Sequence, residues 1–267
     1  MIARVTLGEQ LELLRQRGFD PERAQVIVLM REAAILLFSA FPGLFLMHGG
    51  ANLILFHGSV RTSLDLDLLS QGAPLPKSDD LAKILAEGLL PVATLLDIAP
   101  LKIASAKATD GFIRIEVISK DHRNLFTVDL GGLGSVLAAG VEEHLLEAVS
   151  LNITAIIKAV SRDHLLLQKT EAFVFRPGVK VRDAYDIKLL ADAGAVLSEP
   201  LQSHFSDALA MREVGRNHLL ARIEQVTPKL CRAHLSDVLP ASQYAALERS
   251  HFEPLLLALR EVLQPWL

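Results

Sequence analysis

The spacing of apolar residues predicts helices at the start of the chain. Residues 8–40 carry apolar side chains at helical spacing. Asp20 and Pro21 supply an N-cap and a first-turn proline for a helix that we expect to run through Phe38. The next predicted elements are a strand at 44–47, a helix at 52–56, a half-buried strand at 63–69, a loop at 72–76, a helix at 79–90 closed by Pro91, strands at 101–108 and 112–119 around the turn Thr109-Asp110-Gly111, and a further strand at 126–130 before a loop at 131–134.

The pattern becomes helical from about residue 140. Ser161 can cap a helix that runs through Phe173, another helix begins near Arg182, and prolines at 200, 228, 240 and 254 divide the rest. Strands with interspersed helices followed by helices alone predict an α/β (α+β) protein. We expect an α/β core at residues 1–155 and a helical region at 156–267.

One stretch also fits a membrane span. No charged residue lies between Glu32 and Arg61, and the 24 uncharged and mostly apolar residues 33–56 are long enough to cross a bilayer at about 1.5 Å per residue. Pro42-Gly43 and His48-Gly49-Gly50 interrupt this stretch, however, and divide it into segments of helix, strand and helix length. We therefore favour a buried α/β unit and no membrane insertion.

Composition excludes several classes. With 27 Lys and Arg against 31 Asp and Glu, the net charge of −4 excludes a protein that coats nucleic acid by bulk charge. The single cysteine, Cys231, excludes a disulfide framework and a multi-thiolate zinc site. The first residues lack the basic-then-apolar order of a signal peptide, so we expect a cytoplasmic protein.

Two carboxylates provide the first candidate for chemistry. Asp65 and Asp67 are two apart on a predicted strand, so both leave the same face. Two carboxylates this close repel each other unless a cation lies between them. Mg²⁺ commonly binds one or two carboxylates together with substrate phosphates. The alternative is a pair of acids that face solvent on an edge strand.

A glycine pair lies just upstream of these acids. Gly49 and Gly50 fall between a predicted strand and a predicted helix, where backbone N–H groups can approach an anion closely. An ordinary tight turn is the alternative. Together with Asp65 and Asp67, the pair would form a phosphate-binding turn beside a metal site, as a nucleoside triphosphate with Mg²⁺ requires.

A third element lies downstream. Lys169 falls on a largely apolar helix, and Asp183 and Asp186 share a face of the next one. A salt bridge between packed helices is one interpretation. The other is a lysine that neutralises a triphosphate and an aspartate that orients the phosphates or the lysine.

Taken in order, these motifs resemble the AbiEii family of nucleotidyltransferase toxins. Members carry Gly-Gly-Thr, then Arg-x-Ser-x-Asp-hydrophobic-Asp, then Lys-x-x-Ala-hydrophobic-x-x-Arg, and then Lys/Arg-Asp-x-x-Asp-hydrophobic. The resemblance covers residues 20 to 195, and the matching residues here are Gly49, Gly50, Arg61, Ser63, Asp65, Asp67, Lys169, Ala172, Arg176, Arg182, Asp183 and Asp186.

Two features depart from the family pattern. The threonine after Gly-Gly is Ala51, which removes a hydroxyl that could contact phosphate. The third carboxylate of the fold is ambiguous: Glu116 lies on an alternating strand where members tend to have an acid, and Asp129 competes with it. We favour Glu116 because its strand alternates more regularly.

The resemblance implies a nucleotidyltransferase-fold mixed sheet with flanking helices and metal-assisted nucleotidyl transfer from an NTP. Asp65, Asp67 and Glu116 would bind Mg²⁺, with two ions expected, and Lys169 and Asp186 would complete the catalytic set from the helical region. Nucleotide binding would fall to Gly49, Gly50, Arg61, Ser63 and Lys169.

The family also implies partners. The acceptor would be RNA, tRNA included, and a cognate antitoxin would accompany the toxin. The best local basic patch is 211–232, with Arg212, Arg216, Arg222, Lys229 and Arg232, although a solvated helix face fits it equally. A catalytically silent relative that binds a nucleotide or a partner is the alternative function.

Overall fold

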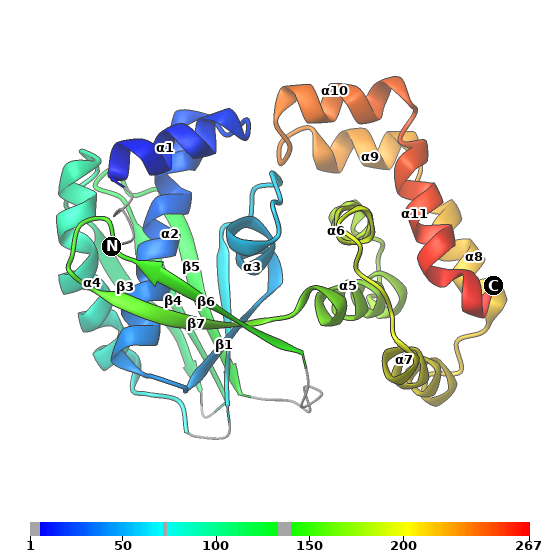
Figure 1. Ribbon diagram of the computed structural model, residues 1–267, viewed down its shortest axis with the longest axis horizontal. Coiled ribbons are helices and arrows are strands. Elements are labelled where there is room, and N and C mark those ends of the chain that lie inside the picture. Colours follow the sequence, from blue (N-terminus) through cyan, green and yellow to red (C-terminus); the bar gives the residue numbers. More distant parts are fainter. Residues whose placement is uncertain (1–5, 72–73, 110, 133–139) are drawn as a thin grey trace. The chain divides into compact units, whose positions relative to one another are not determined.

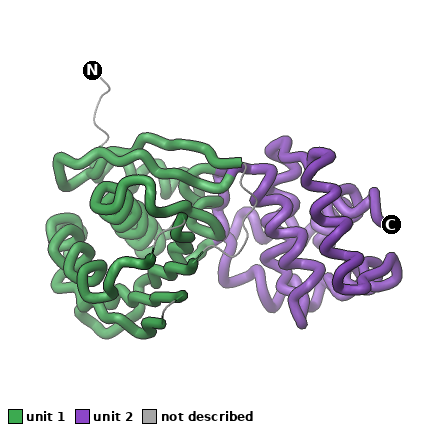
Figure 2. Tube along the Cα trace, turned by 90° about the horizontal axis from the view of Figure 1, so that it is seen from below, with its two compact units in different colours: residues 1–56, 62–160 green, residues 57–61, 161–267 purple. Residues whose placement is uncertain are grey.

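The computed structural model describes residues 6–71, 74–109, 111–132 and 140–267, and the chain divides into two compact units (Figure 2). The first unit comprises Met1–Phe56 and Thr62–Val160. The second comprises His57–Arg61 and Ser161–Leu267. Each unit buries its own set of apolar side chains, for example Leu66 and Ile115 in the first and Phe173 and Leu259 in the second.

A seven-stranded mixed sheet forms the centre of the first unit (Figure 1). Its strand order is β3-β4-β5-β2-β1-β7-β6. The pairs β2–β5 and β1–β7 are parallel and the others antiparallel. This confirms the predicted mixed-sheet α/β fold. The strands are β1 (Phe45–His48), β2 (Asp65–Ser70), β3 (Lys102–Thr109), β4 (Phe112–Ile118), β5 (Asn124–Gly132), β6 (Val141–Glu147) and β7 (Thr154–Val160).

The described residues of this unit also form four helices: α1 (Leu7–Gln16), α2 (Pro21–Ala40), α3 (Gly49–Phe56) and α4 (Ser78–Leu95). As predicted, Asp20 caps α2, and its side chain accepts a hydrogen bond of 2.9 Å from the backbone N–H of Arg23. Helix α2 contacts α4, β7 and β5, and α4 contacts β3 and β4. These contacts cover the sheet face on which Leu66, Leu68 and Ile115 are fully buried, so the opposite face is left for polar side chains.

The uncharged stretch is divided among three elements. It comprises the second half of α2, all of β1 and all of α3. No helix in the described part of the chain is both long enough and apolar enough to cross a bilayer. The breaks at Pro42-Gly43 and at His48-Gly49 were therefore the correct guide to this segment.

Three local predictions were wrong. Residues 141–147 and 154–160 form the hairpin β6–β7 and not helix; Ala155, Ile157 and Ala159 are buried at every second position, a period that the sequence analysis overlooked. Pro91 lies inside α4, which continues to Leu95. Gly131 and Gly132 belong to β5 and not to a loop. Residues 72–73, Asp110 and 133–134, parts of other predicted turns and loops, lie outside the described residues.

The second unit is helical. The prolines predicted to divide this region lie at helix starts: Pro200, Pro228 and Pro254 occupy first-turn positions and Pro240 is an N-cap residue. Helix α6 packs against both α5 and α11. The helices are α5 (Arg162–Phe175), α6 (Val181–Asp192), α7 (Glu199–Met211), α8 (Arg216–Glu224), α9 (Pro228–Leu235), α10 (Ala241–Arg249), α11 (Glu253–Leu263) and the 3₁₀ turn η1 (Gln264–Trp266).

Candidate active site

The two strand aspartates share one face of the sheet. In β2, Leu66, Leu68 and Ser70 are buried, while Asp65 and Asp67 alternate with them and are partly exposed. The side-chain period of two therefore places both carboxylates on the face that α2 and α4 leave uncovered. The shared face expected from the sequence is present.

Gly49 brings the backbone directly against one of these carboxylates. Strand β1 ends at His48, and Gly49 begins α3 with φ +70°, a conformation that L side chains rarely adopt. A Cβ added to Gly49 would lie 2.2 Å from Oδ2 of Asp67. Only glycine fits, because a side chain would collide with the aspartate. The N-terminal N–H groups of α3 and the acid pair thus lie together, as the spacing of the motifs indicates.

Strand pairing determines which other acids lie near this pair. Asp129 on β5 is the register partner of Asp67 on β2, so their side chains are neighbours on the same face. Glu116 on β4 is the register partner of Thr127, whose hydroxyl donates a 2.9 Å hydrogen bond to Oδ1 of Asp65. Glu116 therefore lies two strands away from β2, and Asp129 lies one strand away.

Arg114 is a residue of this face that sequence reasoning missed. It is the register partner of Asp129, and its Nε donates to Oδ1 of that aspartate at 2.7 Å, while Nη2 donates to Oδ2. The alternation of FIRIEVIS, used to select Glu116, places Arg114 on the same face. The alternation of this strand therefore predicts the position of Arg114 as well as that of Glu116.

Lys169 and Asp186 form an ion pair in the second unit. Nζ of Lys169 on α5 lies 2.8 Å from Oδ2 of Asp186 on α6. Arg61, from segment 57–61, donates through Nε at 2.8 Å and Nη2 at 2.9 Å to the two oxygens of the same carboxylate. Burial alone would raise the pKa of Asp186, but Arg61 and Lys169 outweigh it and hold that pKa below its usual value.

Asp183 lies one turn before Asp186 on α6. Its Oδ2 accepts a 2.6 Å hydrogen bond from Nη1 of Arg176, and its Oδ1 lies 4.0 Å from Nζ of Lys169. Burial raises the pKa of Asp183, and the nearby Lys169 and Arg176 only partly offset that effect. The two matched motifs of this region and Arg61 thus form one charge network of Arg61, Lys169, Arg176, Asp183 and Asp186, in which both aspartates are buried and Arg176 is partly exposed.

Two further predicted residues occupy different environments. Ala51 is fully buried in α3, and Ser63 is partly exposed in the segment before β2. The basic patch at 211–232 loses one member: Arg222 is buried, and its guanidinium donates to the carbonyl oxygen of Phe173. Including Arg222 in a surface patch was wrong, because this side chain serves the interior of the unit.

An open cleft of about 420 Å³ in the second unit carries cationic and aromatic groups. It is lined by Gln168, Glu171, Ala172, Phe175, Arg176, Pro177 and Arg212. The guanidinium carbon of Arg212 lies 4.2 Å from the centre of the Phe175 ring, within cation–π distance. Arg212 therefore remains a surface cation beside the helix that carries Lys169.

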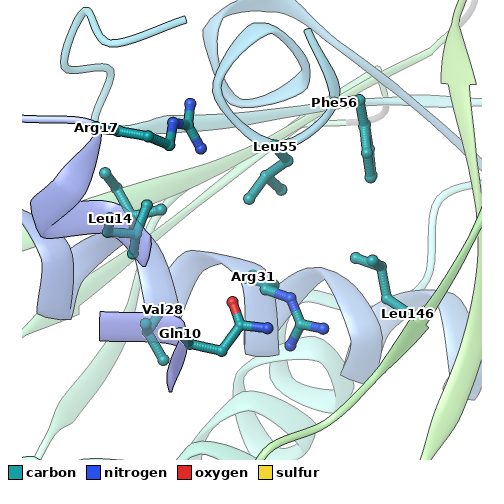
Figure 3. Close-up of a pocket in the computed structure, with 9 residues that line it drawn as sticks. Gln10, Leu14, Arg17, Val28, Arg31, Leu55, Phe56 and Leu146 are labelled. Atoms are coloured by element: carbon teal, nitrogen blue, oxygen red, sulfur yellow. The ribbon is translucent and has the colours of Figure 1, made fainter. Parts of the chain in front are cut away.

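A separate cavity of about 90 Å³ lies in the first unit, lined by residues of α1, α2, α3 and β6 (Figure 3). Arg17 and Arg31 point into it, with Leu55 and Phe56 from the last turn of α3. Nη1 of Arg31 pairs with Glu32 at 2.9 Å. The residues that line it include neither Gly49 nor the strand acids, so it is not part of the candidate active site.

Comparison with known proteins identifies the family. The family model described as nucleotidyl transferase AbiEii toxin, type IV TA system, matches residues 33–265, most of the chain. The chain belongs to the AbiEii family. The resemblance drawn from the motifs is thereby confirmed, and the chain is a member of a family of nucleotidyltransferase toxins.

One solved structure shares the fold of this AbiEii member, and a second is similar to it. A candidate nucleotidyltransferase from Helicobacter pylori aligns with a TM-score of 0.53 at 17% identity, over 93% of this chain and 97% of that chain. MenT4, a nucleotidyltransferase toxin from Mycobacterium tuberculosis H37Rv, aligns with a TM-score of 0.49 at 16% identity, over 94% and 98%. No curated protein matches the sequence.

The AbiEii chain offers oxygen ligands suited to a hard cation. Asp65 and Asp67 supply two carboxylates on one face, beside a backbone turn that only glycine fits. Among the described residues, no group of three His, Cys, Asp or Glu side chains has a geometry that could hold a metal. Asp65 and Asp67 by themselves fit a cation such as Mg²⁺, which commonly takes one or two protein carboxylates and completes its shell with substrate phosphates and water.

Proposed function

We propose that this protein is a Mg²⁺-dependent nucleotidyltransferase that moves a nucleotidyl group from an NTP to an acceptor, as the toxin of a toxin–antitoxin system. The observation that carries this proposal is the contact between Gly49 and Asp67, where a Cβ would lie 2.2 Å from the carboxylate. A glycine-only turn that opens a helix suits phosphates, and an adjacent pair of carboxylates suits the Mg²⁺ that accompanies them.

Asp65 and Asp67 would hold the metal. Bound there, Mg²⁺ would supply Lewis-acid stabilisation of charge on the triphosphate oxygens. Thr127 orients Asp65 through its 2.9 Å hydrogen bond, and the packing of Gly49 restricts Asp67. The backbone N–H groups of Gly49 and Gly50 would bind phosphate, with Ser63 as a further nucleotide contact.

We assign Asp129, and not Glu116, as the third acid of the site. Asp129 neighbours Asp67 across the β2–β5 pair, whereas Glu116 is separated from β2 by the whole of β5. The sequence preference for Glu116 rested on regular alternation, which both strands show on this face. Strand pairing supports the assignment to Asp129.

Lys169 would act in the same reaction through its ammonium. In transfer, the acceptor hydroxyl oxygen bonds to the α-phosphorus, the bond to pyrophosphate breaks, and the hydroxyl proton passes to a base. Lys169 would stabilise the charge that develops on pyrophosphate. Asp186 would orient Lys169, since their ion pair spans 2.8 Å, and Arg61 would hold Asp186 and not contact the nucleotide directly.

RNA is the acceptor class that we propose. The cleft of the second unit combines Arg176 and Arg212 with the ring of Phe175, the pairing of cations and aromatic surface that single-stranded nucleic acid binds. An antitoxin encoded alongside is the partner expected for a toxin family.

The test is transfer by purified protein. Wild type and Asp67→Ala are incubated with Mg²⁺, total RNA and each α-labelled NTP in turn, and label in RNA is counted. We expect transfer from wild type and a loss of at least about 10²-fold in Asp67→Ala, since a principal electrostatic contact is removed. Asp79→Ala, an exposed aspartate at the start of α4, is the matched control. Wild-type transfer by a folded Asp67→Ala variant would contradict the proposal, and no transfer by wild type with any NTP would favour the silent relative.

A further inference from the structure

One row of side chains crosses the sheet of the first unit from the glycine turn to the edge strand β3. Residues that pair in register lie on the same face of a sheet, with neighbouring strands about 4.8 Å apart. The strands β1, β2, β5, β4 and β3 contribute, in this order, His48, Asp67, Asp129, Arg114 and Lys107. The row therefore leads from the turn at Gly49, through two of the acids, to two cations.

A β-bulge brings the second cation into this row. Ala104 on β3 pairs with Glu116 and lies on the open face of the sheet. With regular alternation, residue 106 would be the next on that face and Lys107 would point to the other. The register shifts between Ser105 and Lys107, so that Lys107 lies opposite Arg114. Like charges opposite each other weaken a strand pair, and bulges often re-aim a side chain next to an active site.

Both cations lie over one aromatic ring. Nζ of Lys107 is 5.5 Å from the centre of the Phe112 ring, and the guanidinium carbon of Arg114 is 5.8 Å from it. Phe112 precedes Arg114 by two residues on β4, so it shares the open face, where its side chain is partly exposed. Lys107 is exposed, and 43% of the Arg114 side chain is exposed. Lys107, Phe112 and Arg114 thus form an accessible cationic and aromatic surface, the Phe112 surface.

Acids border the Phe112 surface on the side of the proposed metal site. Arg114 is held in place by Asp129, to which Nε donates at 2.7 Å and Nη2 donates at the other oxygen. Glu116 lies on the same face, two residues after Arg114 on β4. Because carboxylates repel phosphate, a phosphate group on this face favours the position between Arg114 and Lys107, since Lys107 lies two strands away from Asp129.

The row also determines the side from which an acceptor would approach. In the displacement at phosphorus, the attacking and leaving oxygens are roughly in line on opposite sides of the phosphorus. The proposed function places the triphosphate at the Gly49 turn, so pyrophosphate would leave on the β1 side of Asp67. The acceptor hydroxyl would then approach from the side of β5 and β4, where the Phe112 surface lies.

We propose that the Phe112 surface binds the end of a single-stranded RNA acceptor: a base stacks on the Phe112 ring, and Lys107 and Arg114 bind the adjoining phosphate. An aromatic ring beside cations is what single strands bind. This proposal deepens the proposed function, on which it rests for the position of the triphosphate and for the choice of RNA. It adds an acceptor subsite in the first unit to the cleft of Phe175 and Arg212 in the second.

Binding measurements without catalysis test this subsite. The RNA probe is a short single strand of mixed sequence with fluorescein at its 5′ end, and its binding is followed by fluorescence anisotropy. The α,β-methylene analogue of each NTP with Mg²⁺ reports nucleotide binding separately, by isothermal titration calorimetry. The variants are Phe112→Leu, Phe112→Trp and Lys107→Gln. Lys83→Gln is the matched control, because Lys83 lies on α4, which covers the opposite face of the sheet, and 73% of its side chain is exposed. Thermal unfolding checks that each variant is folded.

We expect Phe112→Leu to weaken RNA binding at least about fivefold, because a base loses its stacking partner. Phe112→Trp should stay within about twofold of wild type, because it keeps an aromatic face. Lys107→Gln should reduce the slope of log affinity against log salt by about 0.7, as one lost phosphate contact to a single strand does. Lys83→Gln should match wild type, and every variant should bind the nucleotide analogues as wild type does. In the transfer assay, Phe112→Leu should raise KM for RNA and leave KM for the NTP unchanged.

Four results would overturn the proposal. They are no RNA binding by wild type, wild-type RNA binding by either Phe112→Leu or Lys107→Gln, an equal loss in Phe112→Trp and Phe112→Leu, or a loss of affinity for the nucleotide analogues in place of RNA. The last result would mean that the Phe112 surface holds the base of the NTP. Failure of the proposed function has a different signature: wild type would transfer no nucleotide, while the variants at Phe112 and Lys107 would still show the expected changes in RNA binding.

Discussion

Asp186 shows how one buried residue can hold several charges in place. Its side chain has no exposed surface, and two cations, Arg61 and Lys169, satisfy its oxygens at 2.8–2.9 Å. A buried carboxylate in such a pair stabilises chiefly by preventing its partners from being buried without a counter-charge. Asp186 therefore has a structural role in addition to the orientation of Lys169 that we propose.

Asp186→Asn should reduce the free energy of unfolding by about 3–5 kcal/mol at neutral pH, because Arg61 and Lys169 would face a neutral amide. The pKa of Asp186 is held below the usual 3.8, so the charge contributes fully above pH 3.8. That contribution declines as the pH falls through the lower folded value. Urea unfolding should thus show a gap between variant and wild type that narrows only in acid.

The control for Asp186→Asn lies on the same helix. Asp192 pairs with Lys188 at the surface, with 60% of the aspartate side chain exposed, so Asp192→Asn should cost less than about 1 kcal/mol. Equal losses in the two variants would mean that burial of Asp186 between cations is not what stabilises α6.

The sequence predicts the position of a single residue when that position depends only on its neighbours in the chain. The period of SLDLDLL is enough to place Asp65 and Asp67 on one face, and Gly49 lies at the junction of a strand and a helix. The choice between Glu116 and Asp129 depends on which strand pairs with β2, and residues 112–132 alone do not contain that information. The alternation of the same strand indicates the face of Arg114, but its pairing with Asp129, 15 residues away, depends on strand pairing as well.

At the scale of elements, capping separates two helices that look alike in sequence. Asp20 accepts a hydrogen bond from the backbone N–H of Arg23 and stabilises the start of α2. Ser161 is the N-cap residue of α5 but makes no side-chain bond to the helix backbone, and its hydroxyl lies 3.1 Å from Nδ1 of His164 instead. The residue types predict both caps, but only one makes the expected contact.

Asp20→Ala should therefore reduce the free energy of unfolding by about 1 kcal/mol and lower Tm by roughly 2–4 °C, because a backbone donor at the start of α2 loses its acceptor. Ser161→Ala should cost less than about 0.5 kcal/mol, as a change away from a cap contact does. Thermal unfolding followed by circular dichroism measures both. A larger loss in Ser161→Ala than in Asp20→Ala would show that the cap on α2 is not the difference between these helices.

The misassigned elements show where sequence patterns are weak. The hairpin β6–β7 alternates correctly, but VEEHLLE also contains good helix formers, so two periods compete in a short segment. Pro91 suggested a helix end, yet α4 continues for four more residues, because a buried face formed by Leu85, Leu89 and Val92 holds the helix on both sides of the proline.

At the scale of the whole molecule, the order of motifs along the chain does not follow the division into units. Arg61 precedes Asp65 by four residues, yet segment 57–61 belongs to the second unit, where Arg61 meets Asp186, 125 residues later. No periodicity indicates such a contact. The family resemblance placed Arg61, Asp65 and Asp186 in one motif set, but it did not predict the pair of Arg61 with Asp186.

The two residues that we assign to the transfer step, Lys169 and Asp67, belong to different units. If Lys169 of the second unit and Asp67 of the first serve one transfer step, Lys169→Ala and Asp67→Ala should each reduce turnover by at least about 10²-fold, and the double variant should be little worse than the slower single variant. Residues with separate roles would instead give losses that multiply. Lys158→Ala is the matched control, since Lys158 lies on β7 and faces the surface carboxylate of Glu143, and we expect wild-type turnover. Because a folded Lys169→Ala variant still has both strand aspartates, near-normal turnover in it would remove Lys169 from the reaction and leave its pair with Asp186 a purely structural contact.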